Sequence, residues 1–208
     1  MTKKPILERL RLQPDRRLTF FQQFLRNPQQ IGSVIPSSRF LESRLVGIAG
    51  VAGAQMVVEL GPGTGGTTRA LLRAMPQDCT LLAIESNAEF ARGLAAESDE
   101  RLLVHPGGAQ DLLQVLERRG LPRPQVVLSG IPFSTIPPAL GQQILRDVWS
   151  ALAPGGQFVA YQVRSHVAEL GEAIFGMPEK CFELLNVPPM RVFRWRKPAL
   201  EQDSPLAL

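Results

Sequence analysis

The most constraining feature of the chain is a short apolar strand that runs directly into a glycine-rich turn. Residues 55–60 are predicted to form a buried strand, and four of the next six residues, 61–66, are glycine. A helix is predicted to begin at Thr67. Glycines let a backbone approach a ligand without a Cβ in the way, and amides at the start of a helix face that ligand. This arrangement predicts an α/β fold with a ligand at the carboxyl edge of a parallel sheet.

Strands and helices alternate through the rest of the chain. Further strands are predicted at 81–85, 102–104, 126–129 and 158–161, separated by helices at 67–75, 88–97, 112–118 and 139–152. Two last strand-like runs, 181–187 and 191–195, are separated by only three residues, too few for a crossover helix, so they should pair antiparallel. The prediction is a single Rossmann-like domain with a seven-stranded, mostly parallel sheet and a C-terminal antiparallel hairpin.

The chain divides into three parts. We expect a basic amphipathic helical extension at 1–30, the α/β domain at 31–197 and a loose tail at 198–208. Seven basic and two acidic residues fall within 1–26, whereas the whole chain has 23 basic and 19 acidic residues, so the remainder is nearly neutral. The positive charge is therefore concentrated in the extension, and what the charge indicates about partners concerns the extension.

The extension carries an apolar stripe beside arginines. Its side chains are Arg16, Arg17, Phe20, Phe21 and Phe24. Such a helix suits an anionic membrane surface, where each nearby cation adds about 1 kcal/mol of attraction. The alternative is that the stripe packs against the domain as a lid over its ligand, and one helix can do both.

Other features of the sequence indicate where in the cell the protein lies. No run of about 18 apolar residues is present, so we expect no membrane span, and the N-terminus lacks the apolar segment of a secretory signal. The two cysteines lie far apart and form no metal-like spacing, so no metal is expected. We expect a cytoplasmic protein, peripheral on the inner face of the membrane.

The glycine loop admits two cofactors. Gly61, Gly63 and Gly66 fit a dinucleotide fingerprint, and Glu85, which ends the next strand, can accept the hydroxyls of a ribose in either case. An acid at Glu59 would sit poorly beside a pyrophosphate, and Pro62 flanks the glycines. With the helical lead-in and the terminal hairpin, these residues favour S-adenosylmethionine (SAM) over NAD.

A second loop should reach the same edge of the sheet. Ser129-Gly130-Ile131-Pro132-Phe133 follows the fourth strand, and loops beyond the carboxyl ends of strands line the ligand site of an α/β sheet. The alternative interpretation is a proline turn with a buried phenylalanine.

The stretch from Glu59 to Gly65, with Glu85, resembles the first and second motifs of class I SAM-dependent methyltransferases. The resemblance implies cofactor-binding residues in six short stretches: Ser33; Glu59; Gly61, Gly63, Thr64 and Gly65; Glu85 and Ser86; Gly108 and Ala109; and Ser129. The third motif usually carries an acid near adenine, and this chain has Gly107-Gly108-Ala109 instead, which leaves backbone groups, with Gln110 or Asp111, to hold adenine.

Within that class, the chain resembles the bacterial phospholipid N-methyltransferases. The resemblance rests on residues 20–25, 32–38, the Glu59 motif and 129–133, and it implies methylation of phosphatidylethanolamine towards phosphatidylcholine. The implied catalytic residues are Ser129 and Tyr161. The implied substrate-binding residues are Ser37, Ser38, Gly130, Ile131, Pro132 and Phe133.

Two rival functions remain. An rRNA adenine N6-methyltransferase has a similar lead-in and fourth motif, but the nearly neutral body of this chain is poor for binding phosphates, so we expect no nucleic-acid partner. The second rival function is that of a membrane-binding protein with the SAM fold but without catalysis. The intact set of Glu59, Gly61, Gly63 and Glu85 argues against it.

Overall fold

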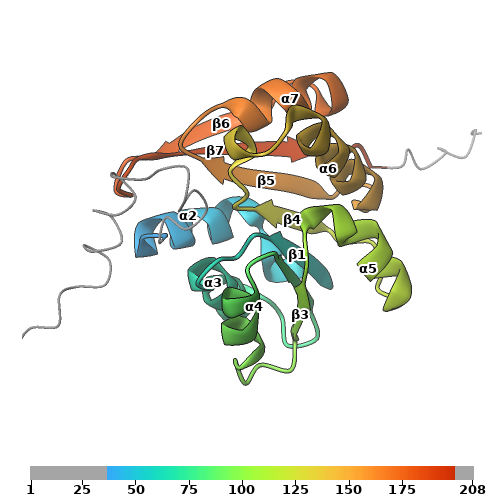
Figure 1. Ribbon diagram of the computed structural model, residues 1–208. Coiled ribbons are helices and arrows are strands. Elements are labelled where there is room, and N and C mark those ends of the chain that lie inside the picture. Colours follow the sequence, from blue (N-terminus) through green and yellow to red (C-terminus); the bar gives the residue numbers. More distant parts are fainter. Residues whose placement is uncertain (1–36, 200–208) are drawn as a thin grey trace, which may run out of the picture.

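The fold was determined from a computed structural model, which describes residues 37–199 (Figure 1). Predictions for Arg16, Arg17, Phe20, Phe21, Phe24 and Ser33, and for most of the tail, lie outside the described residues. A seven-stranded sheet with the order β3-β2-β1-β4-β5-β7-β6 forms the centre. Its strands are β1 (Met56–Leu60), β2 (Thr80–Glu85), β3 (Leu102–Pro106), β4 (Val126–Ser129), β5 (Gln157–Gln162), β6 (Glu179–Glu183) and β7 (Met190–Arg196).

The first five strands are parallel, and β7 runs antiparallel to both β5 and β6. The helices are α2 (Arg39–Ala49), α3 (Gly66–Ala74), α4 (Ala88–Ala95), α5 (Leu112–Arg118), α6 (Pro138–Ala151) and α7 (His166–Phe175). The predicted fold class, with its mostly parallel sheet and reversed strand, is confirmed. None of the helices within residues 37–199 is long and apolar enough to cross a membrane.

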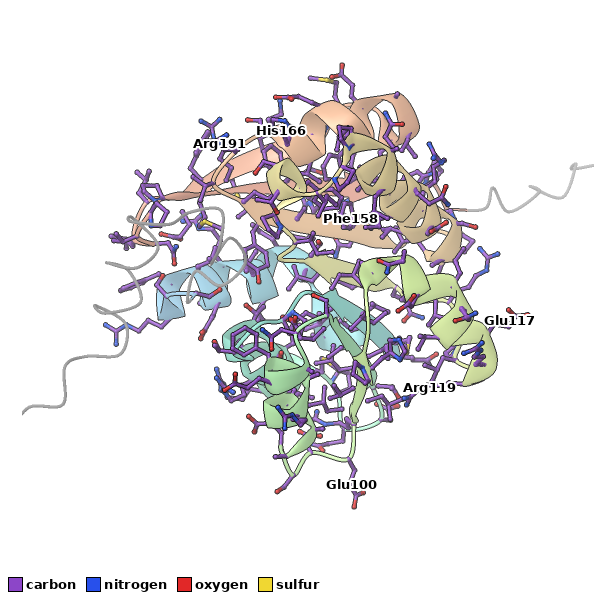
Figure 2. The ribbon with its side chains drawn as sticks, in the orientation of Figure 1. Glu100, Glu117, Arg119, Phe158, His166 and Arg191 are labelled. Atoms are coloured by element: carbon purple, nitrogen blue, oxygen red, sulfur yellow. The ribbon has the colours of Figure 1, made fainter. Side chains whose placement is uncertain are left out.

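Helices cover both faces of the sheet, and alternate residues of each strand serve the two cores. On one face, Met56, Val58 and Leu60 of β1 join a core with α5, α6 and α7. On the other, Val57 joins a core with α2 and α3. Figure 2 shows Phe158 pointing from β5 into the first core, where its ring stacks on that of Trp195 at 5.4 Å. The alternation turns Glu59 towards the same face as Val57, and therefore towards α3.

The C-terminal part departs from the sequence prediction in two ways. The sixth strand ends at Glu183, so residues 184–187 belong to a connection rather than to a strand, and this connection spans 184–189. The prediction missed α7, which packs against α6 and covers β5 and β7. The indole N–H of Trp195 donates to the carbonyl oxygen of Gly176 at 3.0 Å, which fixes the end of α7 on the sheet.

Ser38 starts the first described helix. Its side chain accepts from the N–H of Leu41, and its own N–H donates to the Asn186 side chain at 2.8 Å. Ser38 is therefore the N-cap of α2. Its bond to Asn186 also fixes the start of α2 on the turn between β6 and β7.

Candidate active site

Backbone hydrogen bonds hold the loops after β1, β3 and β4 together at the carboxyl edge of the sheet. The N–H of Gly61 donates to the carbonyl of Ile84 at 2.9 Å, and that of Gly130 donates to the carbonyl of Leu60 at 2.9 Å. The N–H of Gly107 donates to the carbonyl of Glu85 at 3.0 Å. The structure thus brings the predicted glycine loop, Glu85 and the 129–133 loop to one edge of the sheet.

The glycine loop has a backbone that other residues would strain. Gly61 and Gly65 have φ angles of 70° and 80°, in the left-handed region that favours glycine. A Cβ on Gly65 would also lie 2.7 Å from the Leu94 side chain, so the close packing of the loop on α4 excludes larger residues. Thr64, between them in sequence, is exposed.

Glu85 is held in place by two backbone amides. The N–H of Gly63 donates to Oε2 at 2.9 Å, and the N–H of Asn87 donates to Oε1 at 2.8 Å. The residue is 6% exposed. Because each carboxylate oxygen has a further lone pair, the oriented carboxylate keeps acceptor capacity for a pair of ligand hydroxyls. The neighbouring Ser86 is exposed.

Glu59 is fully buried, and only one of its two oxygens is satisfied. Its Oε2 accepts from the Thr68 hydroxyl at 2.6 Å, whereas Oε1 has no hydrogen-bond partner within residues 37–199. Burial raises the pKa of Glu59 to about 7; the Thr68 bond opposes this effect, and the negative charge of Glu85 adds to it. A buried carboxyl with a free acceptor favours a cationic ligand group nearby, because such a charge offsets its desolvation.

A third carboxylate reaches the loop from α2. The Glu42 side chain lies so close to Gly66 that a Cβ there would be 2.5 Å from its Oε1. Glu42, Glu59 and Glu85 therefore surround the turn and the start of α3 with negative charge. Such surroundings suit a sulfonium and an ammonium group and disfavour a pyrophosphate.

Tyr161 lies between the cofactor loop and the 129–133 loop. Its hydroxyl is 3.5 Å from the Thr67 hydroxyl, and a Cβ on Gly130 would be 2.5 Å from it. The residue is 8% exposed. Burial, with smaller contributions from the charges of Glu59 and Glu42, raises the pKa of Tyr161 well above its usual range. The phenol therefore stays protonated and can orient a ligand without acting as a base.

The 129–133 loop is fixed by side chains at both of its sides. Gln162 donates from Nε2 to the carbonyl of Ile131 at 2.7 Å, and Ser129 Oγ accepts from the N–H of Ile131 at 3.3 Å. Ser129 is fully buried, whereas Gly130, Ile131 and Pro132 are partly exposed.

The turn after β3 carries a small polar cluster. Asp111 Oδ2 accepts from the N–H of Gly108 at 3.0 Å and lies 3.3 Å from His105 Nε2. Ala109 is buried in the core, whereas the neighbouring Gln110 is exposed. Within residues 37–199, no three His, Cys, Asp or Glu side chains are grouped to hold a metal ion.

The chain is similar in sequence to proteins of known activity. It is 34% identical over 141 residues to the ornithine lipid N-methyltransferase of Singulisphaera acidiphila, covering 67% of this chain and 73% of that protein. The chain belongs to the class I SAM-dependent methyltransferases. Its cofactor is SAM, as the sequence predicted. No protein-family model matches the chain.

Two further similarities agree with this methyltransferase fold. The ribosomal RNA small subunit methyltransferase A of Laribacter hongkongensis is 37% identical over 39% of this chain, which corresponds to 30% of that enzyme. The O-methyltransferase TomG of Streptomyces achromogenes, solved in complex with SAM, superposes with a TM-score of 0.62 at 17% identity, covering 92% of this chain and 94% of TomG.

The charges and geometry of the site residues of this methyltransferase fit SAM. The unpaired oxygen of Glu59 and the charge of Glu42 suit the methionine end, which carries the cationic groups. Glu85, oriented by Gly63, suits the ribose. Gly61 and Gly65, with their positive φ angles, shape the turn between these acids, so these residues can hold the cofactor beyond the carboxyl ends of β1 and β2.

Several of the predicted site residues lie in surroundings other than those expected. Phe133 was predicted to contact substrate, but it is 1% exposed and packs in the core beside Gly141 of α6. The structure thus agrees with the alternative of a proline turn with a buried phenylalanine. Ser129 lies beneath the loop, bound to its backbone. Ser38 caps α2, and Ser37 lies 3.4 Å from the Thr67 hydroxyl, near Tyr161.

Sequence reasoning missed four residues that shape the site: Glu42, Thr67, Thr68 and Gln162. Thr67 and Thr68 directly follow the glycines, so their hydroxyls were predictable as first-turn groups. Glu42 and Gln162 reach the loop only through tertiary packing, for which the sequence has no local signal.

Proposed function

We propose that this methyltransferase transfers methyl groups to the headgroup amine of a membrane phospholipid, phosphatidylethanolamine, towards phosphatidylcholine. The observation that carries the proposal is the half-exposed Gly130–Pro132 backbone beside Tyr161, at the edge where the acidic cofactor loop ends. The similarity to an ornithine lipid N-methyltransferase supports an amine on a lipid. The sequence of residues 16–24, with two arginines and three phenylalanines, supports an anionic membrane surface on the cytoplasmic side.

SAM supplies a methyl group on a sulfonium, and its transfer forms a nitrogen–carbon bond while the carbon–sulfur electron pair stays on sulfur. The chain's own part is alignment, which can contribute about 7–11 kcal/mol in favourable cases. Gln162 fixes the Ile131 backbone, and the Tyr161 hydroxyl lies beside Gly130 to orient the incoming amine. Tyr161 stays protonated and so is not the base, and we propose that the amine gives its proton to water.

An adenine of ribosomal RNA is the second candidate substrate, favoured by the similarity to ribosomal RNA methyltransferases. The Laribacter enzyme is matched over 30% of its length, and the enzyme of the same name from Gloeobacter violaceus is matched over 66% of its length at 29% identity; the lipid enzyme is matched over 73% of its length at 34% identity. The nearly neutral body also makes an RNA surface less suitable.

The test is methyl transfer from labelled SAM to vesicles that contain phosphatidylethanolamine, with vesicles of ornithine lipid and purified RNA in parallel. We expect label in phosphatidylethanolamine, and much less label with the Glu85→Ala variant at a SAM concentration near the dissociation constant of the unmodified protein. Label in ornithine lipid alone would mean that the proposed headgroup is wrong and that the substrate is still the amine of a lipid. The absence of label from every lipid would refute the proposal.

A further inference from the structure

The connection between β6 and β7 exposes an unusual amount of apolar side chain. Leu184, Leu185 and Val187 are 71%, 63% and 67% exposed, and Phe182, just before them, is 53% exposed. We refer to these four residues as the hairpin tip. Contiguous exposed apolar groups on a soluble domain mark an interaction site.

Buried polar groups hold the hairpin tip in a defined shape. Asn186 is 1% exposed; its Oδ1 accepts from the N–H of Ser38 at 2.8 Å, and its side-chain amide donates to the carbonyl of Pro188 at 2.9 Å. Glu183 is 4% exposed and pairs with Arg44 at 2.6 Å. It also accepts from the N–H of Leu185 at 2.8 Å. These bonds satisfy the buried polar groups of the connection and fix its backbone. The apolar side chains of the hairpin tip point outward from this fixed backbone.

Cations surround the hairpin tip. The guanidinium of Arg191 lies 5.4 Å from the centre of the Phe182 ring, and that of Arg39 lies 5.0 Å from the ring of Phe40, itself 43% exposed. Lys180 precedes Phe182 on the same side of β6 and is exposed. The nearest acid, Glu183, is already neutralised by Arg44. An apolar tip with cations beside it complements an anionic bilayer surface.

The hairpin tip lies at the edge of the sheet that carries the active site. Because β7 is antiparallel to β5, its first residues lie beside the last residues of β5, and Arg191 pairs with Gln162 and Val192 with Tyr161. Figures 1 and 2 show the same end of the hairpin, with Arg191, close to the start of α2. A surface that contacts the tip would face Tyr161 and the loop held by Gln162.

We propose that the hairpin tip inserts into the interface of an anionic bilayer and docks the active-site edge against the lipid headgroups. This inference rests on the proposed function, since a lipid substrate gives the docking its purpose. Four side chains fall well short of the about 20–30 residues a side of a standard protein interface, so a second copy of the chain is a poorer occupant. A bilayer needs only a few buried apolar groups with nearby cations.

The test uses the full chain and vesicles of phosphatidylethanolamine and phosphatidylglycerol, with no SAM present. The triple variant Leu184→Ser, Leu185→Ser, Val187→Ser should lose at least about tenfold in vesicle partitioning, since each buried apolar side chain contributes more than 1 kcal/mol. The matched control is Met177→Ser, which alters a side chain 69% exposed just before β6, at the opposite end of the hairpin. It should bind within twofold of the unmodified protein, a range of about 0.4 kcal/mol.

Depth is measured separately with Leu185→Trp, whose added fluorescence should be quenched by brominated lipid chains above the background of Trp149 and Trp195. This variant keeps an apolar tip, so it also serves if the triple variant fails to fold. Unchanged partitioning of a folded triple variant, or an unquenched tryptophan, would overturn the inference.

Other occupants give distinct results. If residues 1–36 cover the hairpin tip, the triple variant lowers the midpoint of thermal unfolding while vesicle binding stays unchanged. If a second copy covers it, sedimentation shows a dimer that the triple variant dissociates. Either result overturns the inference. Tip-dependent vesicle binding without methylation of lipid would refute the proposed function and leave the docking intact.

Discussion

The backbone N–H of Gly63 donates to Oε2 of Glu85 at 2.9 Å, so the glycine loop itself sets the orientation of the acid that ends β2. Two strands that are neighbours in the sheet thereby deliver one preorganised acceptor. The bond also explains why the loop and the acid, 24 residues apart in sequence from Gly61 to Glu85, behave as one element.

The first prediction concerns Glu85. Glu85→Ala removes an acceptor whose hydrogen bonds, being charged, contribute about 1.5–3 kcal/mol each, so SAM affinity should fall by between about tenfold and a hundredfold. Isothermal titration calorimetry measures it. Glu85→Gln keeps one acceptor oxygen, so its affinity for SAM should lie between those of the unmodified protein and of Glu85→Ala. An Ala variant with unaltered affinity would refute the ribose assignment.

The second prediction follows from the raised pKa of Glu59, about 7 against an ordinary 4.5. Between these values the folded protein binds more protons than the unfolded chain, so the free energy of unfolding should fall as pH rises from about 5 to 8. At about 1.4 kcal/mol per pH unit, the loss has a ceiling of about 3.5 kcal/mol for a pKa that moves from 4.5 to about 7. Denaturant unfolding of the ligand-free protein at several pH values measures it.

Glu59→Gln is the control for this titration, because it keeps the shape and removes the ionisation. The difference in free energy of unfolding between the two proteins should therefore change with pH across this window and be constant above it. Parallel curves for the two proteins would show that Glu59 titrates as an ordinary carboxyl.

The third prediction concerns Gly130. A Cβ there would lie 2.5 Å from the Tyr161 hydroxyl and 2.9 Å from the carbonyl oxygen of Gly61. Since the backbone oxygen cannot move freely, Gly130→Ala should push the two loops apart and lower kcat by at least about tenfold, or about 1.4 kcal/mol. Gly47→Ala, on the exposed face of α2 with nothing within 4 Å of its Cβ, is the control. It should keep full activity and gain about 0.5–1 kcal/mol of stability.

The fourth prediction separates positioning from stability at Gln162. Gln162→Leu breaks the bond to the Ile131 carbonyl, and Gln157→Leu breaks an equivalent bond, 2.6 Å to the Ala49 carbonyl, at the other end of β5. Both should cost about 1 kcal/mol of stability. Only Gln162→Leu should lower kcat, with KM for SAM unchanged. Equal kcat losses in the two variants would mean that Gln162 acts through stability alone.

Much of the fold was predictable because strands and helices alternate with clear turn residues between them. The exception at the C-terminus has physical causes. Leu184, Leu185 and Val187 give residues 184–187 the look of a strand, but Asn186 turns inward to bind Ser38. Pro188 and Pro189 cannot donate to a sheet. Helix α7 was missed although Val167, Leu170 and Ile174 have helical spacing and Gly176 follows the last turn.

The site divides in the same way. The glycines, Glu59 and Glu85 were predictable because adjacent strand ends must meet at one edge of a parallel sheet. The burial of Phe133 was not decided by sequence, since a proline turn can point the ring either way. Glu42 and Gln162 were missed because α2 and the end of β5 approach the loops only in the folded molecule.

The most direct measurement is a competition between substrates in one reaction. The full chain is incubated with methyl-labelled SAM, phosphatidylethanolamine vesicles and purified ribosomal RNA, and lipid and RNA are then extracted and analysed by mass spectrometry. The account predicts label on the amine nitrogen of the lipid, with RNA unlabelled. Label on adenine of the RNA with unlabelled lipid would contradict it.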